Sequence, residues 1–233
     1  MARDIEVDFA NQTTGSAIIR PQVSMAPMSY ARDEAIRLVD WILSGLGSEE
    51  TLCLELPFLN VRRKADIAIL SQSRLSAIEV KGARDNTQKL EQQLHDYASM
   101  FLDVTVATTE NHLHRVRSIA AKSIGIVLLG ETSIELVRKP IRRRRLEKAS
   151  AAKWLGRSEL DQLLGRNEVR SFGVEGAREL VCRTHSADIL TATALESLST
   201  KNLARFAAFN AERGRVIDLD DIHLLSLQSK VRN

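Results

Sequence analysis

Two short apolar segments separated by a polar turn place the tightest constraint on how this chain folds. Ala65–Leu70 and Ser76–Lys81 are rich in Ile, Ala and Val, and the polar residues 71–74 lie between them. Short apolar segments of this kind, bounded by turn residues, are typical of β-strands. The sequence therefore predicts a hairpin over residues 63–82.

The predicted hairpin carries charged residues on an otherwise apolar background. Side chains alternate faces along a strand, so Glu79 and Lys81 point the same way, and pairing of the two strands brings Asp66 alongside them. Two carboxylates that share a small pocket repel each other unless a cation lies nearby. A hard divalent ion such as Mg²⁺ accepts oxygen ligands, and a neighbouring lysine can orient water for attack on a phosphodiester. The alternative is a solvated strand face with a surface ion pair.

The spacing of Asp66, Glu79 and Lys81 resembles the D…ExK pattern of the PD-(D/E)XK nuclease superfamily over about residues 30–140. Ala65 stands where the proline of the family name would be. The resemblance implies that Asp66 and Glu79 bind Mg²⁺ or Mn²⁺ with help from the Val80 backbone carbonyl. It also implies that Lys81 positions the attacking water.

A helix is predicted next, over Thr87–Phe101, because apolar residues recur there at helical spacing. Lys89, Gln93 and Tyr97 are each four residues apart and so lie along one side of that helix. Gln93 and Tyr97 form a QxxxY pattern that resembles the helix motif of RecB-like nucleases, in which these side chains border the metal site and contact DNA. The alternative is a Gln on a solvated face and a Tyr half in the core.

The order of predicted elements is consistent with that resemblance. A helix at 30–46 precedes strands at 52–56, 65–70 and 76–81, and after the helix at 87–101 come strand 102–109, helix 112–121 and strand 124–129. Strands linked by helices predict an α/β fold. The resemblance implies a restriction-endonuclease-like αβββαβ core, with a mixed sheet flanked by helices. Many relatives supply a further acid, for which Glu55 in the first strand is favoured over Glu34 in the first helix.

Basic residues are concentrated in one segment. The formal net charge is only +3, yet residues 138–148 contain seven basic residues and one acid, including Arg142, Arg143, Arg144 and Arg145. A second cluster, Arg62, Arg63 and Lys64, precedes the Asp66 strand. Such patches suit a phosphate backbone, so we predict that both clusters, with Lys89, bind nucleic acid. The alternative for 142–145 is a solvated interdomain linker.

After about residue 150 the pattern becomes helical, with short helices predicted at 151–155, 158–164, 176–182, 187–198 and 201–212. The segment 153–164 is similar to one that follows the nuclease core in the bacterial and phage family known as sce-seven-seven-two-six. We therefore predict an irregular arm at 1–29, a nuclease core at 30–140, a basic linker at 141–150 and a small all-helical domain at 151–233.

These patterns predict a metal-dependent deoxyribonuclease, and the family resemblance implies a role in phage or bacterial DNA processing or defence. The alternative is a nuclease-inactive module on the same fold that binds nucleic acid or a partner. DNA is the expected partner; RNA, a homodimer and a protein bound through the helical domain remain open. Apolar segments are too short to span a bilayer, the N-terminus lacks a signal-peptide core, and Cys53 and Cys182 are expected to be reduced, so a cytoplasmic location without membrane contact is expected.

Overall fold

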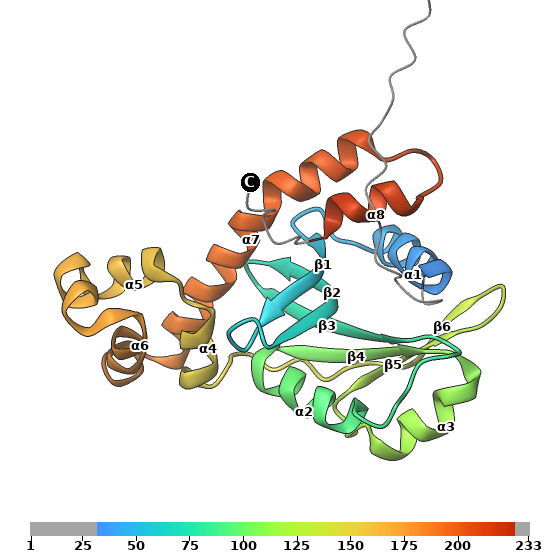
Figure 1. The fold of residues 1–233 in the computed structure, drawn as a ribbon, viewed down its shortest axis with the longest axis horizontal. Helices are drawn as coiled ribbons and strands as arrows, with labels where there is room; N and C mark the ends of the chain where they lie inside the picture. The colour runs from blue at the N-terminus through green and yellow to red at the C-terminus, as the bar shows by residue number, and fades with distance from the viewer. Residues whose placement is uncertain (1–31, 227–233) are drawn as a thin grey trace, which may run out of the picture.

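A six-stranded mixed sheet forms the centre of the protein (Figure 1). The computed structural model describes residues 32–226. The strands are β1 (Thr51–Phe58), β2 (Arg63–Ser71), β3 (Arg74–Lys81), β4 (Asp103–Thr108), β5 (Gly125–Leu129) and β6 (Ile134–Arg138), and they lie in sequence order. The first three and the last pair are antiparallel, whereas β3, β4 and β5 are parallel. The prediction of an α/β fold with a mixed central sheet is confirmed.

Helices cover both faces of the sheet. They are α1 (Arg32–Ser44), α2 (Leu90–Met100), α3 (Glu110–Ile119), α4 (Lys148–Trp154), α5 (Arg157–Leu164), α6 (Arg166–Thr184), α7 (Ala187–Glu212) and α8 (Leu219–Leu225). In Figure 1, α2 and α3 lie below the sheet and α1 and α8 lie above it. Parallel strands need crossover connections, and α2 and α3 provide them. None of the helices in residues 32–226 is both long and apolar enough to cross a membrane.

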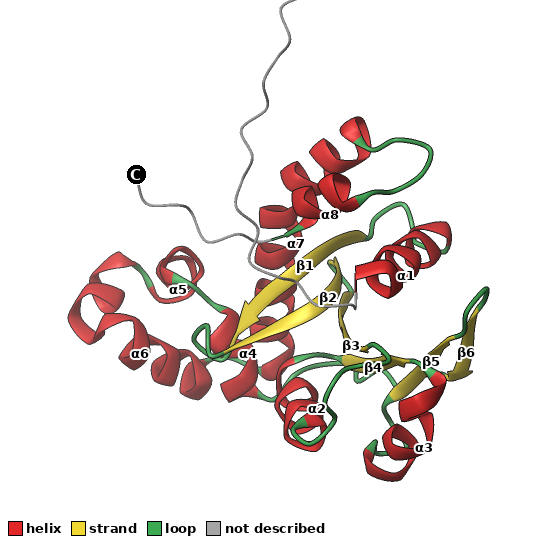
Figure 2. Ribbon diagram, turned by 45° about the vertical axis from the view of Figure 1, so that its right-hand side comes forward, coloured by secondary structure: helices red, strands yellow, loops and turns green. Residues whose placement is uncertain are grey.

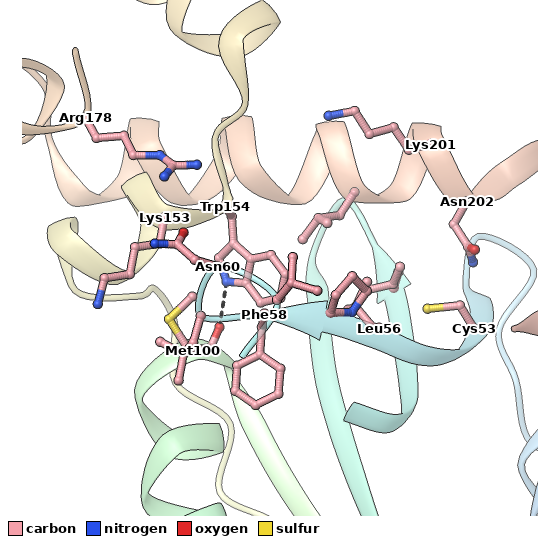
Figure 3. Close-up of a pocket in the computed structure, with 15 residues that line it drawn as sticks. Cys53, Leu56, Phe58, Asn60, Met100, Lys153, Trp154, Arg178, Lys201 and Asn202 are labelled. Carbon is pink, nitrogen blue, oxygen red and sulfur yellow. Dashed lines mark hydrogen bonds between the residues drawn. The ribbon is translucent and has the colours of Figure 1, made fainter. Parts of the chain in front are cut away.

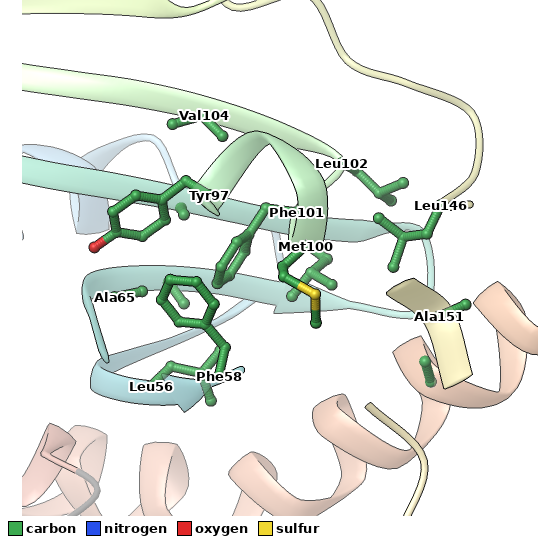
Figure 4. Close-up of a cluster of buried hydrophobic side chains, with 14 of the residues drawn as sticks. Leu56, Phe58, Ala65, Tyr97, Met100, Phe101, Leu102, Val104, Leu146 and Ala151 are labelled. Atoms are coloured by element: carbon green, nitrogen blue, oxygen red, sulfur yellow. The ribbon is translucent and has the colours of Figure 1, made fainter. Parts of the chain in front are cut away.

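The larger apolar core lies between α2 and the sheet and is rich in aromatic rings (Figure 4). Phe58 from β1 contacts Tyr97 and Phe101 of α2, with ring centroids 5.1 and 5.2 Å apart, and Phe101 also packs edge-on against Trp154 of α4. Such aromatic pairs add stability beyond the area they bury. The rings therefore fix α2 relative to β1, which matters for the site described below.

The C-terminal helices share this core with the sheet, because one continuous apolar cluster includes residues of β1–β4 and of α4–α7. The long helix α7 runs beside β1 and β2 in both ribbon views (Figure 2). Buried Asn202 attaches it to the sheet edge, since its Nδ2 donates to the Leu52 carbonyl and the Thr51 hydroxyl, each at 3.1 Å. The six-stranded sheet and this helical region are therefore packed directly on each other.

Several elements differ from the sequence predictions. The two helices predicted at 187–198 and 201–212 are one helix, α7, and the helix predicted at 176–182 is the second half of α6. Strand β6 and helix α8 were not predicted. Both cysteines are free thiols, as expected. The predicted arm at 1–29 lies outside the described residues.

Candidate functional site

A cleft opens where strands β2 and β3 separate. Their backbone pairing ends at Ile67 and Ile78, whereas β3 continues to pair with β4 as far as Lys81. Asp66 and Glu79 are the next residues of the two strands and face this gap. The Asp66 Oδ2 atom accepts a hydrogen bond from the Val80 N–H at 2.8 Å, so a side chain links the strands where backbone pairing has stopped.

The cleft has a volume of about 360 Å³ and collects the residues that the D…ExK and QxxxY patterns singled out. Asp66 comes from β2, Glu79 and Lys81 from β3, and Gln93 from α2. The charged and amide residues in its walls are Glu55, Asp66, Glu79, Lys81, Asp85, Asn86 and Gln93. The structure thus brings together residues that lie up to 38 positions apart in the sequence, from Glu55 to Gln93.

The Glu79 carboxylate is the most constrained group in the cleft, with 2% of the residue exposed. Its Oε1 accepts hydrogen bonds from Lys81 Nζ at 2.5 Å and Gln93 Nε2 at 2.7 Å, and its Oε2 accepts one from the Tyr97 hydroxyl at 2.6 Å. A buried carboxylate requires such donors, because its loss of hydration is otherwise very costly. Gln93 and Tyr97 therefore act on the same group, as members of one network with Lys81.

Tyr97 serves only as a donor in this network. Burial and the neighbouring Glu79 both raise the pKa of Tyr97 far above its usual value, so its hydroxyl stays protonated. Its oxygen also lies 3.0 Å from the Lys64 carbonyl. The ring contact with Phe58 fixes the position of this hydroxyl from the other side.

The second carboxylate, Asp66, is electrostatically unfavourable in this position. Burial raises its pKa, and repulsion from Glu79 adds to the effect, so that the pKa of Asp66 is about 7 despite the hydrogen bond from Val80. The cleft therefore favours either a proton on Asp66 or a cation beside it.

The donor set suits a hydrated Mg²⁺ or Mn²⁺ ion. Mg²⁺ usually binds through one or two carboxylates plus substrate phosphates, and it keeps several waters. Asp66 and Glu79 meet that requirement. Within residues 32–226, no group of three or more His, Cys, Asp or Glu side chains is arranged to hold a metal ion.

Glu55 reaches the cleft through an unusual backbone. Its φ of 54° lies in the left-handed region, which is uncommon for residues other than glycine. Its carboxylate forms an ion pair with Lys64 at 3.3 Å. Glu34 instead lines a different hollow, beside α3 and the β5–β6 turn. Of the two acids weighed from sequence, Glu55 is the one in the cleft.

The sequence predictions missed other residues of the cleft. Asp85 and Asn86 follow β3, and the sequence gives them only the composition of a turn; Asp85 accepts a hydrogen bond from the Gly82 N–H at 2.7 Å. Ile222 and Ser226, from α8 and the residue after it, complete the wall. No local signal indicates these two, because they lie more than 140 positions from Lys81 in the sequence.

The predicted basic run is mostly engaged with the protein itself. Arg142 pairs with buried Asp103 at 2.8 Å, Arg143 donates to two carbonyl groups at the end of α2 at 2.6 Å, and Arg145 pairs with an α7 carboxylate at 2.8 Å. Only Arg144 of the four has no hydrogen bond or ion pair with another described residue. The run thus attaches the segment between β6 and α4 to the core.

The other predicted basic residues are distributed around the sheet edge. Arg63 pairs with Asp96 at 2.8 Å, and Lys64 pairs with Glu55. Arg62 and Lys89 are exposed, the first in the β1–β2 turn and the second at the start of α2. Their binding to nucleic acid remains a prediction.

Comparison with known proteins places the chain in a phage family. The family model described as Bacteriophage P4 protein cII matches residues 31–226. Protein cII of Enterobacteria phage P4 is 28% identical over 161 residues, which cover 67% of this chain and 59% of that protein. The chain thus spans about three-fifths of its relative's length. A protein of unknown function from Silicibacter pomeroyi has a TM-score of 0.40 at 12% identity, covering 78% of this chain and 94% of that one, a likeness too distant to support an argument. Because the family model covers most of its length, the chain belongs to the bacteriophage P4 protein cII family.

Proposed function

We propose that the protein is a metal-dependent nuclease that hydrolyses DNA phosphodiester bonds in the cleft between β2 and β3. One observation carries the proposal: Glu79 is buried beside Asp66 and is held at once by Lys81, Gln93 and Tyr97. A purely structural ion pair does not need a second carboxylate at its side. The succession α1, β1, β2, β3, α2, β4 supports a restriction-endonuclease-like core, in keeping with the D…ExK and QxxxY patterns.

Each residue has a distinct task in this proposal. Asp66 and Glu79 hold Mg²⁺ or Mn²⁺, with the Val80 carbonyl as a further ligand, and the bound ion supplies charge stabilisation at the phosphoryl oxygens. Lys81 orients the attacking water through its ammonium group. Gln93 and Tyr97 fix the Glu79 carboxylate, so that it does not rotate when the substrate arrives.

A cleavage assay tests the proposal directly. The protein is incubated with linear, circular and single-stranded DNA in Mg²⁺, in Mn²⁺ or in EDTA. We expect cleavage in either metal and none in EDTA, and we expect Asp66→Ala, Glu79→Ala and Lys81→Ala each to abolish it. Lys122→Ala is the matched control, because Lys122 is exposed and lies outside the cleft. Undiminished cleavage by the Lys81→Ala variant, or cleavage in EDTA, would refute the assignment.

A second candidate function is a nuclease-inactive module that binds nucleic acid or a partner. It is favoured by one feature, namely that both oxygens of Glu79 already accept hydrogen bonds from protein donors. Calorimetric titration with Mg²⁺ or Mn²⁺ separates the two. The nuclease requires metal binding that is weakened by Asp66→Asn, whereas the inactive module requires neither metal binding nor cleavage.

A further inference from the structure

A second cavity lies on the far side of β1 from the cleft, beneath α7 (Figure 3). It has a volume of about 380 Å³, within the usual range for ligand pockets. Its walls are mainly apolar and include Leu56, Phe58, Met100 and Leu198, with the half-buried Trp154 at the centre of the view in Figure 3. An apolar cavity with an indole in its wall is suited to a flat aromatic ligand.

Positive charge surrounds this cavity. It is continuous in its lining with a more polar hollow of about 420 Å³, since Leu59, Asn60 and Lys153 line both. Among the described residues that line either hollow, one carboxylate, Asp96, faces a larger set of cations: Arg62, Arg63, Lys153, Arg178 and Lys201.

Two of these cations are available for a ligand. Arg63, Arg178 and Lys201 form ion pairs within the protein, whereas the side chains of Lys153 and Arg62 have no hydrogen bond or ion pair with another residue in the range 32–226. Both are exposed. An apolar cavity with unpaired cations at its rim matches a ligand that combines a ring with an anion.

The far end of the cavity offers an unsatisfied polar atom. Asn202 lines that end, and its side chain extends from α7 toward β1 in Figure 3. The residue is 4% exposed, and its Oδ1 atom has no hydrogen-bond partner in the described part of the chain. Buried acceptors are nearly always satisfied, so this unpaired oxygen beside the cavity is one of few exceptions among the described residues.

The turn between the cavity and the cleft has a strained backbone. Leu59, Asn60 and Val61 have consecutive φ values of 50°, 56° and 66°, and a β-branched residue such as Val61 is a genuine outlier there. Val61 is also 71% exposed, so burial of its own side chain does not explain the conformation. Strain of this kind is concentrated at ligand-binding sites.

The cavity is also close to the proposed active site. Arg63 begins β2 and Asp66 follows three residues later, which corresponds to about 10 Å along a strand. Phe58 lines the cavity and its ring contacts the ring of Tyr97, whose hydroxyl donates a hydrogen bond to Glu79. A strand of nucleic acid bound in the cleft can therefore extend past the β1–β2 turn to the cavity.

We propose that this cavity binds an unpaired nucleobase of a single-stranded DNA substrate, with Lys153 and Arg62 on the flanking phosphates. The inference rests on the proposed nuclease function and specifies its substrate class. Base-paired DNA cannot insert a base without unpairing it, which costs a few kcal/mol. Stacking on an aromatic side chain tolerates any base, because every base has a π-face.

Binding of labelled 12-nucleotide DNA in EDTA, measured by fluorescence anisotropy, tests the inference without cleavage. The probes are oligo(dT), an abasic strand of the same length and charge, and a 12-base-pair duplex. Stacking of a base is worth roughly 5- to 150-fold in affinity, so oligo(dT) should bind at least fivefold more tightly than the abasic strand. Leu198→Trp, which fills the cavity, should remove this difference and leave abasic and duplex binding unchanged.

Two further measurements test the inference even if Leu198→Trp fails to fold. Lys153→Gln changes only an exposed rim residue and should weaken oligo(dT) and abasic binding alike, whereas Lys122→Gln, outside both hollows, should not. Trp41→Phe leaves Trp154 as the only tryptophan, and oligo(dT) should then quench its fluorescence while the abasic strand does not. Equal affinity for oligo(dT) and abasic DNA, or no quenching, would overturn the inference.

The test is independent of catalysis. Lys81→Ala should lose cleavage in Mg²⁺ yet keep its preference for oligo(dT) over abasic DNA in EDTA. Cleavage without that preference would leave the nuclease proposal intact and reject the base pocket. A preference for oligo(dT) without any cleavage would support the base pocket and reject the nuclease proposal. A Leu198→Trp variant that binds all three probes like the wild type would also overturn the inference, because the base would then bind outside the cavity.

Discussion

Replacing Asp66 with Asn should stabilise the protein in the absence of metal, although it removes a residue of the proposed active site. Asn keeps the shape of the side chain and an oxygen that can accept the hydrogen bond from Val80. It removes the negative charge that burial and Glu79 disfavour. The substitution therefore isolates the electrostatic cost of Asp66 from its structural contacts.

The size and sign of the effect follow from the pKa. The pKa of Asp66 is about 7 in the folded protein and about 3.9 in an unfolded chain. The folded state thus holds a proton that the unfolded state releases, so the free energy of unfolding falls as pH rises from about 4 to about 7. Three pKa units correspond to about 4 kcal/mol. Because Asp66 keeps partial contact with solvent, we expect about half of that.

Urea denaturation at pH 5 and pH 8 in EDTA measures this difference. Asp66→Asn should be more stable than the wild type at pH 8, by roughly 2 kcal/mol, and the gap should shrink by about half or more at pH 5. Addition of Mg²⁺ should stabilise the wild type and narrow the gap, because a ligand that binds only the folded state raises its stability. The account of the cleft would be refuted if the stability gain of Asp66→Asn over the wild type were smaller at pH 8 than at pH 5.

Four other substitutions test the surroundings of the cleft and the basic run. Gln93→Ala should reduce cleavage at least tenfold and change the melting temperature little, whereas Gln92→Ala, at the neighbouring exposed position, should leave cleavage unchanged. Tyr97→Phe keeps the buried ring but leaves Glu79 Oε2 without its donor, which should cost about 1–3 kcal/mol in urea denaturation and lower the cleavage rate. Arg143→Gln should lower the melting temperature without changing the salt dependence of DNA binding, because Arg143 donates to carbonyl groups of the protein. Arg144→Gln should leave the melting temperature unchanged and reduce the slope of log affinity against log salt by roughly 0.9. A reduced slope for Arg143→Gln as well would show that Arg143 binds DNA in spite of its contacts within the protein.

Local patterns were sufficient to predict the centre of the cleft. Glu79 and Lys81 share a face because strand side chains alternate, and Gln93 and Tyr97 share one because they are four apart in a helix. The hairpin turn at 71–74 sets the register that brings Asp66 opposite Glu79. Each of these inferences depends on fewer than twenty neighbouring residues, and periodicity determines structure at that range.

The predictions that failed depend on contacts between distant parts of the chain. Two helices were predicted at 187–198 and 201–212, yet packing against β1 and β2 keeps α7 continuous between them. The binding of nucleic acid by the basic run was predicted from charge density alone, and it stays a prediction. The partners of the run, such as the Asp103 carboxylate beneath Arg142, lie up to 45 positions away, and no sequence pattern indicates that these charges are already paired.

The left-handed backbone at Glu55 links the local strand pattern to contacts between distant parts of the chain. In a regular strand, Cys53 and Leu56 would lie on opposite faces, yet both belong to the core beneath α2, and so does Phe58. The left-handed Glu55 between them shifts the alternation, so that the side chains after it point to the opposite face of the sheet from the one a regular strand would give them. Without that change Phe58 would turn to the α1 side, and Tyr97 would lose the ring that holds its hydroxyl against Glu79. A left-handed residue in the edge strand, which no periodic pattern predicts, therefore places Phe58 both against Tyr97 and in the wall of the neighbouring cavity.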